Sequence, residues 1–325
     1  MVAVGAVAML GYKVELVMVA LGGNAFLRKG EKGDVEEQWA NVTRAARQIV
    51  EMISRGYRVV VTHGNGPQVG IVMEWMENMR DKIPPLTMDI ATAMTQGWLG
   101  YMLQQAIGNE MEKRGMKRRV VALVNQVQVN PEDPAFRNPT KYIGPYYSEE
   151  EARILSSVKG WVMRKDPRGG WRRVVPSPDP ILNVEVEAVR KLLDEGYVVV
   201  ASGGGGIPVY RDKEGALSGV EAVIDKDLAG ALLAREVGAD ALIILTDVEG
   251  VYLDYGRPGQ RLLRELSLNE ARKLFETGVF PPGSMGPKVL ACIRFLEDGG
   301  KVAAIGHLEK AIEIIEGRSG TLIRP

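Results

Sequence analysis

Short runs of branched apolar residues alternate along this chain with longer stretches in which apolar residues return every three or four positions. The runs predict buried strands over 14–20, 58–62, 120–124, 198–201 and 241–246. Strands that are apolar at nearly every position are typical of a parallel sheet covered on both faces. The periodic stretches predict helices over 35–55, from 68 onward, and over 88–114, 225–237, 267–277, 288–297 and 308–316. This alternation predicts an α/β sandwich with a mainly parallel central sheet.

One block breaks the alternation. Eight of the seventeen prolines lie between Pro131 and Pro180, and a Gly169-Gly170 pair separates two strand-like runs, 161–165 and 171–175. Two such runs around a glycine turn predict a β-hairpin, and residues 149–157 predict one short helix beside it. We expect residues 128–180 to form a stiff, protruding, proline-rich hairpin subdomain that acts as a lid or flap.

The length of 325 residues exceeds that of a typical single core and predicts two lobes. We divide the chain into an N-terminal extension (1–13), a first lobe (14–205, with the protruding subdomain) and a second lobe (206–325). The extension is small and apolar, lacks a basic start and runs into a predicted strand, so it does not read as a signal peptide. With no apolar run near about 18 residues, we expect a cytoplasmic protein without a membrane span.

Charge and cysteine content exclude several classes of function. The chain has 41 lysines and arginines and 41 aspartates and glutamates. It therefore carries no net positive charge that would attract nucleic acid or an anionic membrane. The single cysteine, Cys292, excludes an internal disulfide and a multi-thiolate zinc site, and its helical apolar spacing predicts a core residue. The two histidines, His63 and His307, lie too far apart in the chain to suggest a histidine metal site.

Three glycine turns follow predicted strands. They are Gly22-Gly23-Asn24, Gly64-Asn65-Gly66 and Ser202–Gly206. A turn of glycine and asparagine at a strand end brings bare backbone N–H groups to a helix start, where anions bind. We therefore predict one phosphate-handling crevice. Walker A, G-x-G-x-x-G and protein-kinase signatures are absent, so the common nucleotide-binding motifs do not apply.

A few charged residues stand in unusual contexts. Asp225 and Lys226 open a predicted helix, where aspartate is an ordinary N-cap but lysine opposes the helix dipole unless an anion lies beside it. Lys288 follows another glycine turn at a helix start, and is either a phosphate ligand or a solvated lysine. Lys141 lies inside the stiff insertion and alone would read as a surface lysine. His63 is either a general base or a structural residue beside its glycine turn.

Nine segments together resemble the signatures of carbamate kinases, within the amino-acid-kinase superfamily. The matching segments are 20–25 (ALGGNA), 62–70 (THGNGPQVG), 133–136 (DPAF), 139–145 (PTKYIGP), 170–178 (GWRRVVPSP), 203–209 (GGGGIPV), 221–229 (EAVIDKDLA), 245–248 (LTDV) and 283–288 (GSMGPK). They run in order from about residue 14 to the C-terminus. The PTKYIGP and WRRVVPSP segments are specific to carbamate kinases, whereas several others are shared across the superfamily.

The resemblance implies a three-layer αβα sandwich of two lobes. The first lobe would bind the small acceptor, the second the nucleotide, and the insertion would cover the acceptor site. It further implies a homodimer, a place in arginine metabolism and the reaction ATP + carbamate ⇌ ADP + carbamoyl phosphate with Mg²⁺. The ion would be held by nucleotide oxygens and water, without protein ligands.

The resemblance also implies roles for individual residues. Lys141, arriving with the flap, would serve the carbamoyl phosphate, Lys226 and Lys288 would neutralise the nucleotide phosphates, and Asp225 would orient the lysines. The acceptor would be bound by Gly22, Gly23, Asn24, Gly64, Asn65 and Gly66. The nucleotide would be bound by Gly204, Gly205, Thr246, Asp247, Val248, Tyr252, Met285 and Gly286.

Two other functions stay open from the sequence. The same fold could phosphorylate a different small acid, such as acetylglutamate, a nucleoside monophosphate or an isoprenoid phosphate. Alternatively, the chain could be a nucleotide-binding regulatory module without catalysis. The flap lysine argues against the first, and the four retained charged residues argue against the second.

Overall fold

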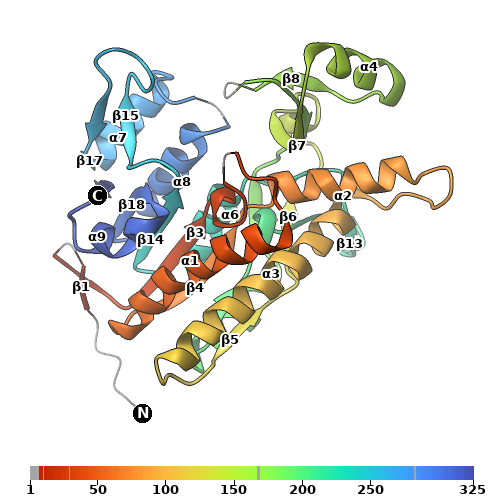
Figure 1. Cartoon of the computed structure of the whole chain (residues 1–325). Coiled ribbons are helices and arrows are strands. Elements are labelled where there is room, and N and C mark those ends of the chain that lie inside the picture. The colour runs from red at the N-terminus through yellow and green to blue at the C-terminus, as the bar shows by residue number, and fades with distance from the viewer. Residues whose placement is uncertain (1–6, 10, 29, 167–168, 282) are drawn as a thin grey trace.

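An eight-stranded sheet forms the centre of the protein in a computed structural model, which describes residues 7–9, 11–28, 30–166, 169–281 and 283–325 (Figure 1). In spatial order its strands are β17 (Glu265–Ser267), β19 (Thr321–Arg324), β18 (Val302–His307), β14 (Ala241–Thr246), β3 (Leu16–Leu21), β4 (Arg58–His63), β11 (Val198–Val200) and β5 (Val120–Ala122). Neighbouring strands are parallel at every step except β18–β19. The prediction of a mainly parallel central sheet is confirmed.

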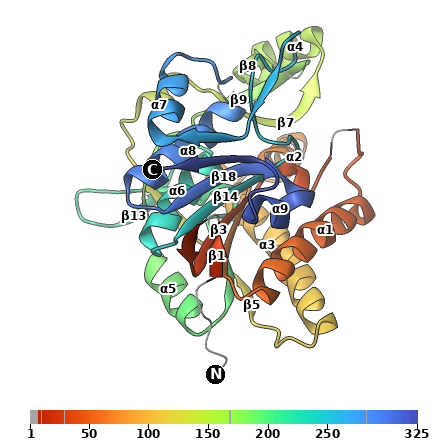
Figure 2. The same ribbon diagram turned by 90° about the vertical axis from the view of Figure 1, so that its left-hand side faces the viewer.

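Helices cover both faces of this sheet (Figure 2). One face packs against α1 (Val35–Ser54), α3 (Met88–Lys113) and α9 (Ala311–Ile315), and the other against α5 (Val186–Asp194), α6 (Lys226–Glu236) and α8 (Met285–Glu297). Side chains of β3 alternate between the two cores, because successive residues of a strand point to opposite faces. Cys292 is fully buried in the second core, as its spacing predicts. The αβα sandwich is therefore as expected.

A second, four-stranded sheet was not foreseen. It contains β10 (Pro180–Asn183), β6 (Gln126–Val129), β12 (Ile207–Arg211) and β13 (Leu217–Gly219) in that order. Residues 207–219 were assigned to the second lobe, yet β12 pairs with β6 of the first. The two lobes also share the central sheet, where β3 of the first lies beside β14 of the second.

The proline-rich insertion projects from this body (Figure 1). Its hairpin joins β8 (Met163–Lys165) to β9 (Trp171–Val175), and α4 (Glu149–Lys159) packs beside it, close to the predicted bounds. An additional strand, β7 (Lys141–Tyr147), pairs with the other side of β9. Lys141, the expected flap lysine of the site, is the first residue of this strand.

The remaining elements complete the chain. The described part of the N-terminal extension forms a small hairpin of β1 (Val7–Met9) and β2 (Tyr12–Val14), while residues 1–6 and 10 of that extension lie outside the described residues. The other elements are α2 (Gly66–Asn78), α7 (Leu268–Glu276), β15 (Val251–Leu253), β16 (Arg261–Leu263) and four short 3₁₀ turns. In the described residues, no helix is both long enough and apolar enough to cross a membrane.

Candidate active site

The three glycine turns meet at one edge of the central sheet. They follow β3, β4 and β11, which are neighbouring parallel strands, so their carboxyl ends lie side by side. The first two turns are joined by a hydrogen bond of 3.1 Å from the Gly64 N–H to the Leu21 carbonyl. This edge is where ligands bind in open α/β sheets.

Only some of the backbone donors in these turns are free to bind a ligand. The N–H groups of Gly22 and Gly64 donate to the carbonyls of Leu245 and Leu21, so they are already paired within the protein, and Gly22 and Gly64 stay proposed acceptor-binding residues. In the described residues, the N–H groups of Gly23, Asn65 and Gly66 have no hydrogen-bond acceptor in the protein. These three N–H groups are therefore available as donors to a ligand.

Lys226 lies beside both acceptor turns. A methyl group built on Gly64 would lie 3.6 Å from Cδ of Lys226 and 3.8 Å from the Gly23 nitrogen. The lysine side chain, 8% exposed, thus runs along the gap between the first two turns. Lys226 therefore lies beside the second turn, close to the first.

Asp225 both caps α6 and binds the flap lysine. Its Oδ1 accepts hydrogen bonds from the backbone N–H groups of Asp227 (2.8 Å) and Leu228 (3.3 Å). Its Oδ2 accepts one from Nζ of Lys141 at 2.6 Å. The ordinary N-cap and the proposed partner of a lysine are therefore the same side chain.

Asp227 is the functional candidate that the sequence reasoning missed. Its Oδ1 accepts a hydrogen bond from Nζ of Lys226, and its Oδ2 accepts one from Nζ of Lys288 at 2.9 Å. Two of the three predicted lysines thus converge on Asp227 and not on Asp225. The clue in the sequence was the second acidic residue of Asp225-Lys226-Asp227. A buried lysine needs a nearby carboxylate as its counter-charge.

Burial and pairing shift the ionisation of this cluster. Burial lowers the pKa of Lys226 to about 8, against the pull of Asp227. For Asp227, burial alone would raise the pKa, but Lys226 and Lys288 outweigh it and hold the pKa well below its usual range. For Lys288, burial works to lower the pKa, and Asp227 outweighs burial so that the pKa is raised. The site is thus built to hold charge away from water.

The predicted nucleotide residues fall into two places. The turn Thr246–Val248 follows β14, and the Asp247 carboxylate is close enough to help raise the pKa of Lys288. Met285 and Gly286 begin α8, the helix that carries Lys288, and Tyr252 lies in β15. These residues share the second lobe with two of the lysines.

Gly204 and Gly205 lie in the third glycine turn, where a methyl group on Gly205 would lie 2.3 Å from the Ile224 carbonyl oxygen, just before Asp225. They are fully buried after β11, which β4 and β3 separate from β14, or roughly 14 Å at ordinary strand spacing. Gly204 has φ of +67°, and a methyl group there would lie 2.3 Å from the Asn65 amide. The third glycine turn therefore packs beneath the second one.

His63 is held as a structural residue. It is 1% exposed, its Nδ1 lies 3.1 Å from the Gly64 carbonyl oxygen, and its ring packs edge-on against Phe26. Burial lowers its pKa to about 4, so the imidazole is neutral at physiological pH and Nδ1 carries the proton donated to the carbonyl. It shapes the turn beside Lys226.

Comparison with known proteins assigns the chain to a family. The model of the amino acid kinase family matches residues 15–307. A carbamate kinase of Pyrococcus furiosus is 55% identical, with 95% of this chain and 99% of that protein aligned. The chain belongs to the amino acid kinase family. Within that family it groups with the carbamate kinases.

Solved structures of amino acid kinases agree. A carbamate kinase from Giardia lamblia bound to citric acid has a TM-score of 0.91 at 41% identity, covering 96% of this chain and 98% of the other. The Giardia lamblia carbamate kinase bound to AMP-PNP has a TM-score of 0.87 at 42% identity, with the same coverage. The fold and the family that the motifs implied are thus confirmed.

The flap of this amino acid kinase lies against both lobes. The backbones of Gly70 in α2 and Gly144 in β7 approach so closely that a methyl group on Gly70 would lie 2.0 Å from the Gly144 α-carbon. On the other side, the Tyr142 ring lies close to Gly283, just before α8. Lys141, next to Tyr142, is thereby held at the start of α6, where it pairs with Asp225.

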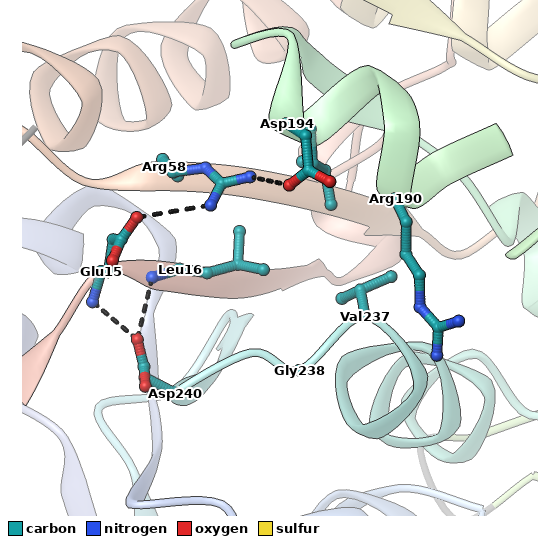
Figure 3. A pocket seen from close by; sticks show the side chains of 9 residues that line it. Glu15, Leu16, Arg58, Arg190, Asp194, Val237, Gly238 and Asp240 are labelled. Atoms are coloured by element: carbon teal, nitrogen blue, oxygen red, sulfur yellow. Dashed lines mark hydrogen bonds and ion pairs between the residues drawn. The ribbon is translucent and has the colours of Figure 1, made fainter. Parts of the chain in front are cut away.

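A cavity of about 300 Å³ lies at the opposite edge of the sheet, away from this cluster (Figure 3). Arg58 bridges Glu15 and Asp194 at 3.4 and 3.0 Å, and Asp240 accepts hydrogen bonds from the backbone of Glu15 and Leu16. Arg190 donates to the Glu236 carbonyl. Since each charged group that lines the cavity has a partner, we assign no chemistry to it.

Proposed function

We propose that this chain transfers a phosphoryl group reversibly between ATP and carbamate, giving ADP and carbamoyl phosphate. One observation carries the proposal: Lys141, Lys226 and Lys288, from three distant segments, converge on two aspartates at the start of α6. They lie beside glycine turns with free backbone donors. The close relatives named above supply carbamate as the acceptor.

The chemistry needs little beyond position and charge. A carbamate oxygen attacks the terminal phosphorus of ATP, the bond from that phosphorus to the ADP oxygen breaks, and negative charge spreads over the transferring oxygens. Lys226 and Lys288 neutralise that charge from the second lobe, and Lys141 does so from the flap. Asp225 and Asp227 hold the three ammonium groups in place before substrate arrives.

The acceptor is held by the first lobe. The free N–H groups of Gly23, Asn65 and Gly66 suit a carboxylate, and the adjacent Lys226 adds charge. Gly204 packs against Asn65 of this turn, whereas Gly205 packs against Ile224, the residue before Asp225, and both stay proposed nucleotide-binding residues. Asn24 remains a proposed acceptor residue within the first turn.

The nucleotide is held by the second lobe. We assign its adenosine part to Thr246, Asp247, Val248 and Tyr252, and its phosphates to the start of α8 at Met285 and Gly286. The Giardia lamblia relative that binds AMP-PNP supports a nucleotide site in this fold. The division into an acceptor lobe and a nucleotide lobe stays a proposal.

Magnesium would enter with the nucleotide. The described residues contain no group of three or more His, Cys, Asp or Glu suited to a metal ion. The carboxylates of Asp225 and Asp227 are already paired with lysines. Mg²⁺ keeps several waters and is commonly bound through phosphate oxygens. The bound ion would neutralise phosphate charge beside Lys288.

We also propose a homodimer in the cytoplasm, formed through an apolar face of α2 and α3. Ile90, Met94 and Tyr101 of α3 are 41%, 47% and 56% exposed and fall at helical spacing on one side. Trp75 of α2, 59% exposed, stacks on Trp98 of α3 with ring centroids 6.5 Å apart. Sedimentation of the wild type and a Met94→Asp variant would test this face, since a monomeric wild type would reject it.

The direct test is ATP formation from ADP and carbamoyl phosphate by the purified protein. A kinase for another small acid would instead turn over with a different acceptor in a panel. A regulatory module would bind ADP tightly and form no ATP. The preferred direction in the cell, including any role in arginine breakdown, is a separate measurement of metabolite flux.

A further inference from the structure

Gly70 is a buried glycine in the interior of α2, the helix beneath the flap (Figure 1). Glycine destabilises a helix interior relative to alanine, so a glycine there calls for a packing reason. The reason here is a contact between backbones. A methyl group on Gly70 would lie 2.0 Å from both the α-carbon and the nitrogen of Gly144. The backbone of β7 therefore fills the space that a side chain at position 70 would need.

The contact between β7 and α2 extends along the helix. Gly66 lies one helical turn before Gly70, on the same face, and a methyl group there would lie 3.5 Å from the Tyr142 carbonyl oxygen. Between these two contacts, Ile143 is fully buried in a small apolar core that includes Val69 of α2. The start of β7 is thus packed directly on the first half of α2.

The bend of β7 at Gly144 is fixed from within the flap. Gly144 has φ of +72°, and the pairing of β7 with β9 shifts register between Ile143 and Tyr147. The Gly144 carbonyl accepts a hydrogen bond of 3.0 Å from Nε of Arg172, whose guanidinium also pairs with Asp166 at 3.3 Å. Arg172 and Asp166 are both buried. A push on Gly144 would therefore move the strand and not only one peptide.

Such a movement would reach the flap lysine. Lys141 is three residues before Gly144 in the same strand, and residues 141–143 pair with β9 in continuous register. Its Nζ lies 2.6 Å from Oδ2 of Asp225. Carbon atoms in ordinary contact lie about 3.5–4.0 Å apart, so a methyl group on Gly70 would push β7 away by more than about 1 Å. That distance is enough to break the contact with Asp225.

We propose that Gly70 is a positioning residue, whose missing side chain lets β7 pack on α2 at the depth that brings Lys141 to Asp225. The effect on turnover rests on the proposed function, whereas the placement of Lys141 can be measured without it. Since α2 also begins at the second glycine turn, one helix then sets both the backbone donors of that turn and the position of the flap lysine.

The kinetic test is a double-mutant cycle of Gly70→Ala and Lys141→Ala. For ATP formation from ADP and carbamoyl phosphate, we expect Gly70→Ala to lower kcat about 10- to 100-fold and to change the KM for ADP less than about threefold. In the Lys141→Ala background the same substitution should lower kcat less than about threefold, because the lysine that it displaces is already gone. An equal loss in both backgrounds would overturn the role of Gly70.

Gly160→Ala is the matched control. Gly160 ends α4 in the same flap with φ of +64°, and no atom lies within 4 Å of a methyl group built there. Alanine at this position strains the backbone without pushing β7. We expect its kcat to stay within about twofold of the wild type, since Lys141 is not displaced. A loss as large as that of Gly70→Ala would show that any disturbance of the flap has the same effect, and would overturn the specific role of Gly70.

The second measurement does not depend on activity. Trinitrobenzenesulfonate labels accessible lysine amines, and mass spectrometry of peptides gives the labelling rate of Lys141, whose side chain is 21% exposed. We expect Lys141 to be labelled several-fold faster in Gly70→Ala than in the wild type, as in Asp225→Asn, which removes its partner. The rate in Gly160→Ala should match the wild type. An unchanged rate in Gly70→Ala would overturn the proposal, even with reduced turnover.

Two further outcomes are distinguishable. If Gly70→Ala does not fold, Ile143→Val removes one methyl group from the same contact, and it should speed the labelling of Lys141 by a smaller factor. No acceleration in Ile143→Val would then overturn the proposal. If the wild type forms no ATP while Gly70→Ala still speeds the labelling, the proposed function is rejected and the positioning role of Gly70 is supported.

Discussion

The two edges of the central sheet both gather charged residues, yet they differ in what those charges can do. At the carboxyl edge, Lys141 pairs with Asp225 at 2.6 Å. At the amino edge, Lys301 pairs with Asp240, also at 2.6 Å. A cavity of about 300 Å³ lies at the amino edge, so a search for cavities alone would favour that edge as the candidate site.

Burial and pairing separate the edges. The side chains of Lys226 and Asp227 are 9% and 3% exposed, whereas those of Lys301 and Asp194 are 45% and 76% exposed. Exposed ion pairs contribute only about 0–1 kcal/mol, since water screens them. At the carboxyl edge, three ammonium groups share two carboxylates out of water, beside free backbone donors. Preorganised charge of this kind, and not cavity size, is what phosphoryl transfer uses.

The sharpest contrast should come from the aspartates. Asp227→Asn leaves Lys226 and Lys288 buried without a counter-charge, so we expect a loss of about 3–5 kcal/mol in unfolding free energy and no measurable turnover. Denaturant unfolding and an ATP-formation assay measure both. Asp240→Asn should cost less than about 2 kcal/mol and keep turnover. Similar losses of stability and turnover in Asp227→Asn and Asp240→Asn would contradict the proposed difference between the two edges.

Lys288→Ala tests the nucleotide side. We expect turnover to fall about 10²- to 10³-fold, with a weaker apparent affinity for ADP, because a charge on the transferring group is lost. Steady-state kinetics with varied ADP measure both changes. Unaltered kinetics would remove Lys288 from the site.

Variants of Asp225 distinguish its role as a helix cap from its role in catalysis. Asp225→Asn keeps an N-cap but loses the charge that binds Lys141, so turnover should fall about 10- to 100-fold with little change in melting temperature. Asp225→Ala should in addition lose about 1 kcal/mol of stability, the usual cost of losing a cap. If Asp225→Asn melts as low as Asp225→Ala while both keep full turnover, capping is the whole role.

The pH dependence is the mildest test. With a pKa of about 8 in the folded protein, Lys226 loses its charge as pH rises through about 8, so kcat/KM should decline above that pH. The unfolded lysine still binds its proton between about pH 8 and the ordinary value of 10.5, so this group adds stability as pH rises there. In Lys226→Arg the remaining activity should lack the decline, and a decline that persists would assign it elsewhere.

Much of the carboxyl edge of the sheet could be predicted from the sequence. The strands at 58–62 and 241–246 have unbroken apolar centres, Val59–Val61 and Ala241–Leu245, and their burial in a parallel sheet follows from that pattern. The glycine turns, Lys226 and Lys288 stood out from their local contexts, whereas the role of Lys141 came only from the family resemblance. The four-stranded sheet was missed because short runs such as Gln126–Val129 carry polar residues and are stabilised by pairing with distant segments. Strand β18 was also missed, although Val302–Ile305 is an apolar run.

Which carboxylate pairs with which lysine in the site could not be predicted from the sequence. Local sequence marks Asp225 as a cap but does not reveal that Lys288, 61 positions after Asp227, shares that second carboxylate. The packing of Gly204 under Asn65 also depends on strand order, which places β11 beside β4. Tertiary contacts thus decide which residues hold the lysines.

The most direct test of the account is ATP formation from ADP and carbamoyl phosphate by the wild type, Lys141→Ala and Lys301→Ala, the two lysines in matched pairs at opposite edges. We expect the wild type and Lys301→Ala to form ATP at the same rate, and Lys141→Ala to lose about 10²-fold or more while binding ADP with unchanged affinity. Equal rates for the two variants, or no ATP from the wild type, would contradict the account.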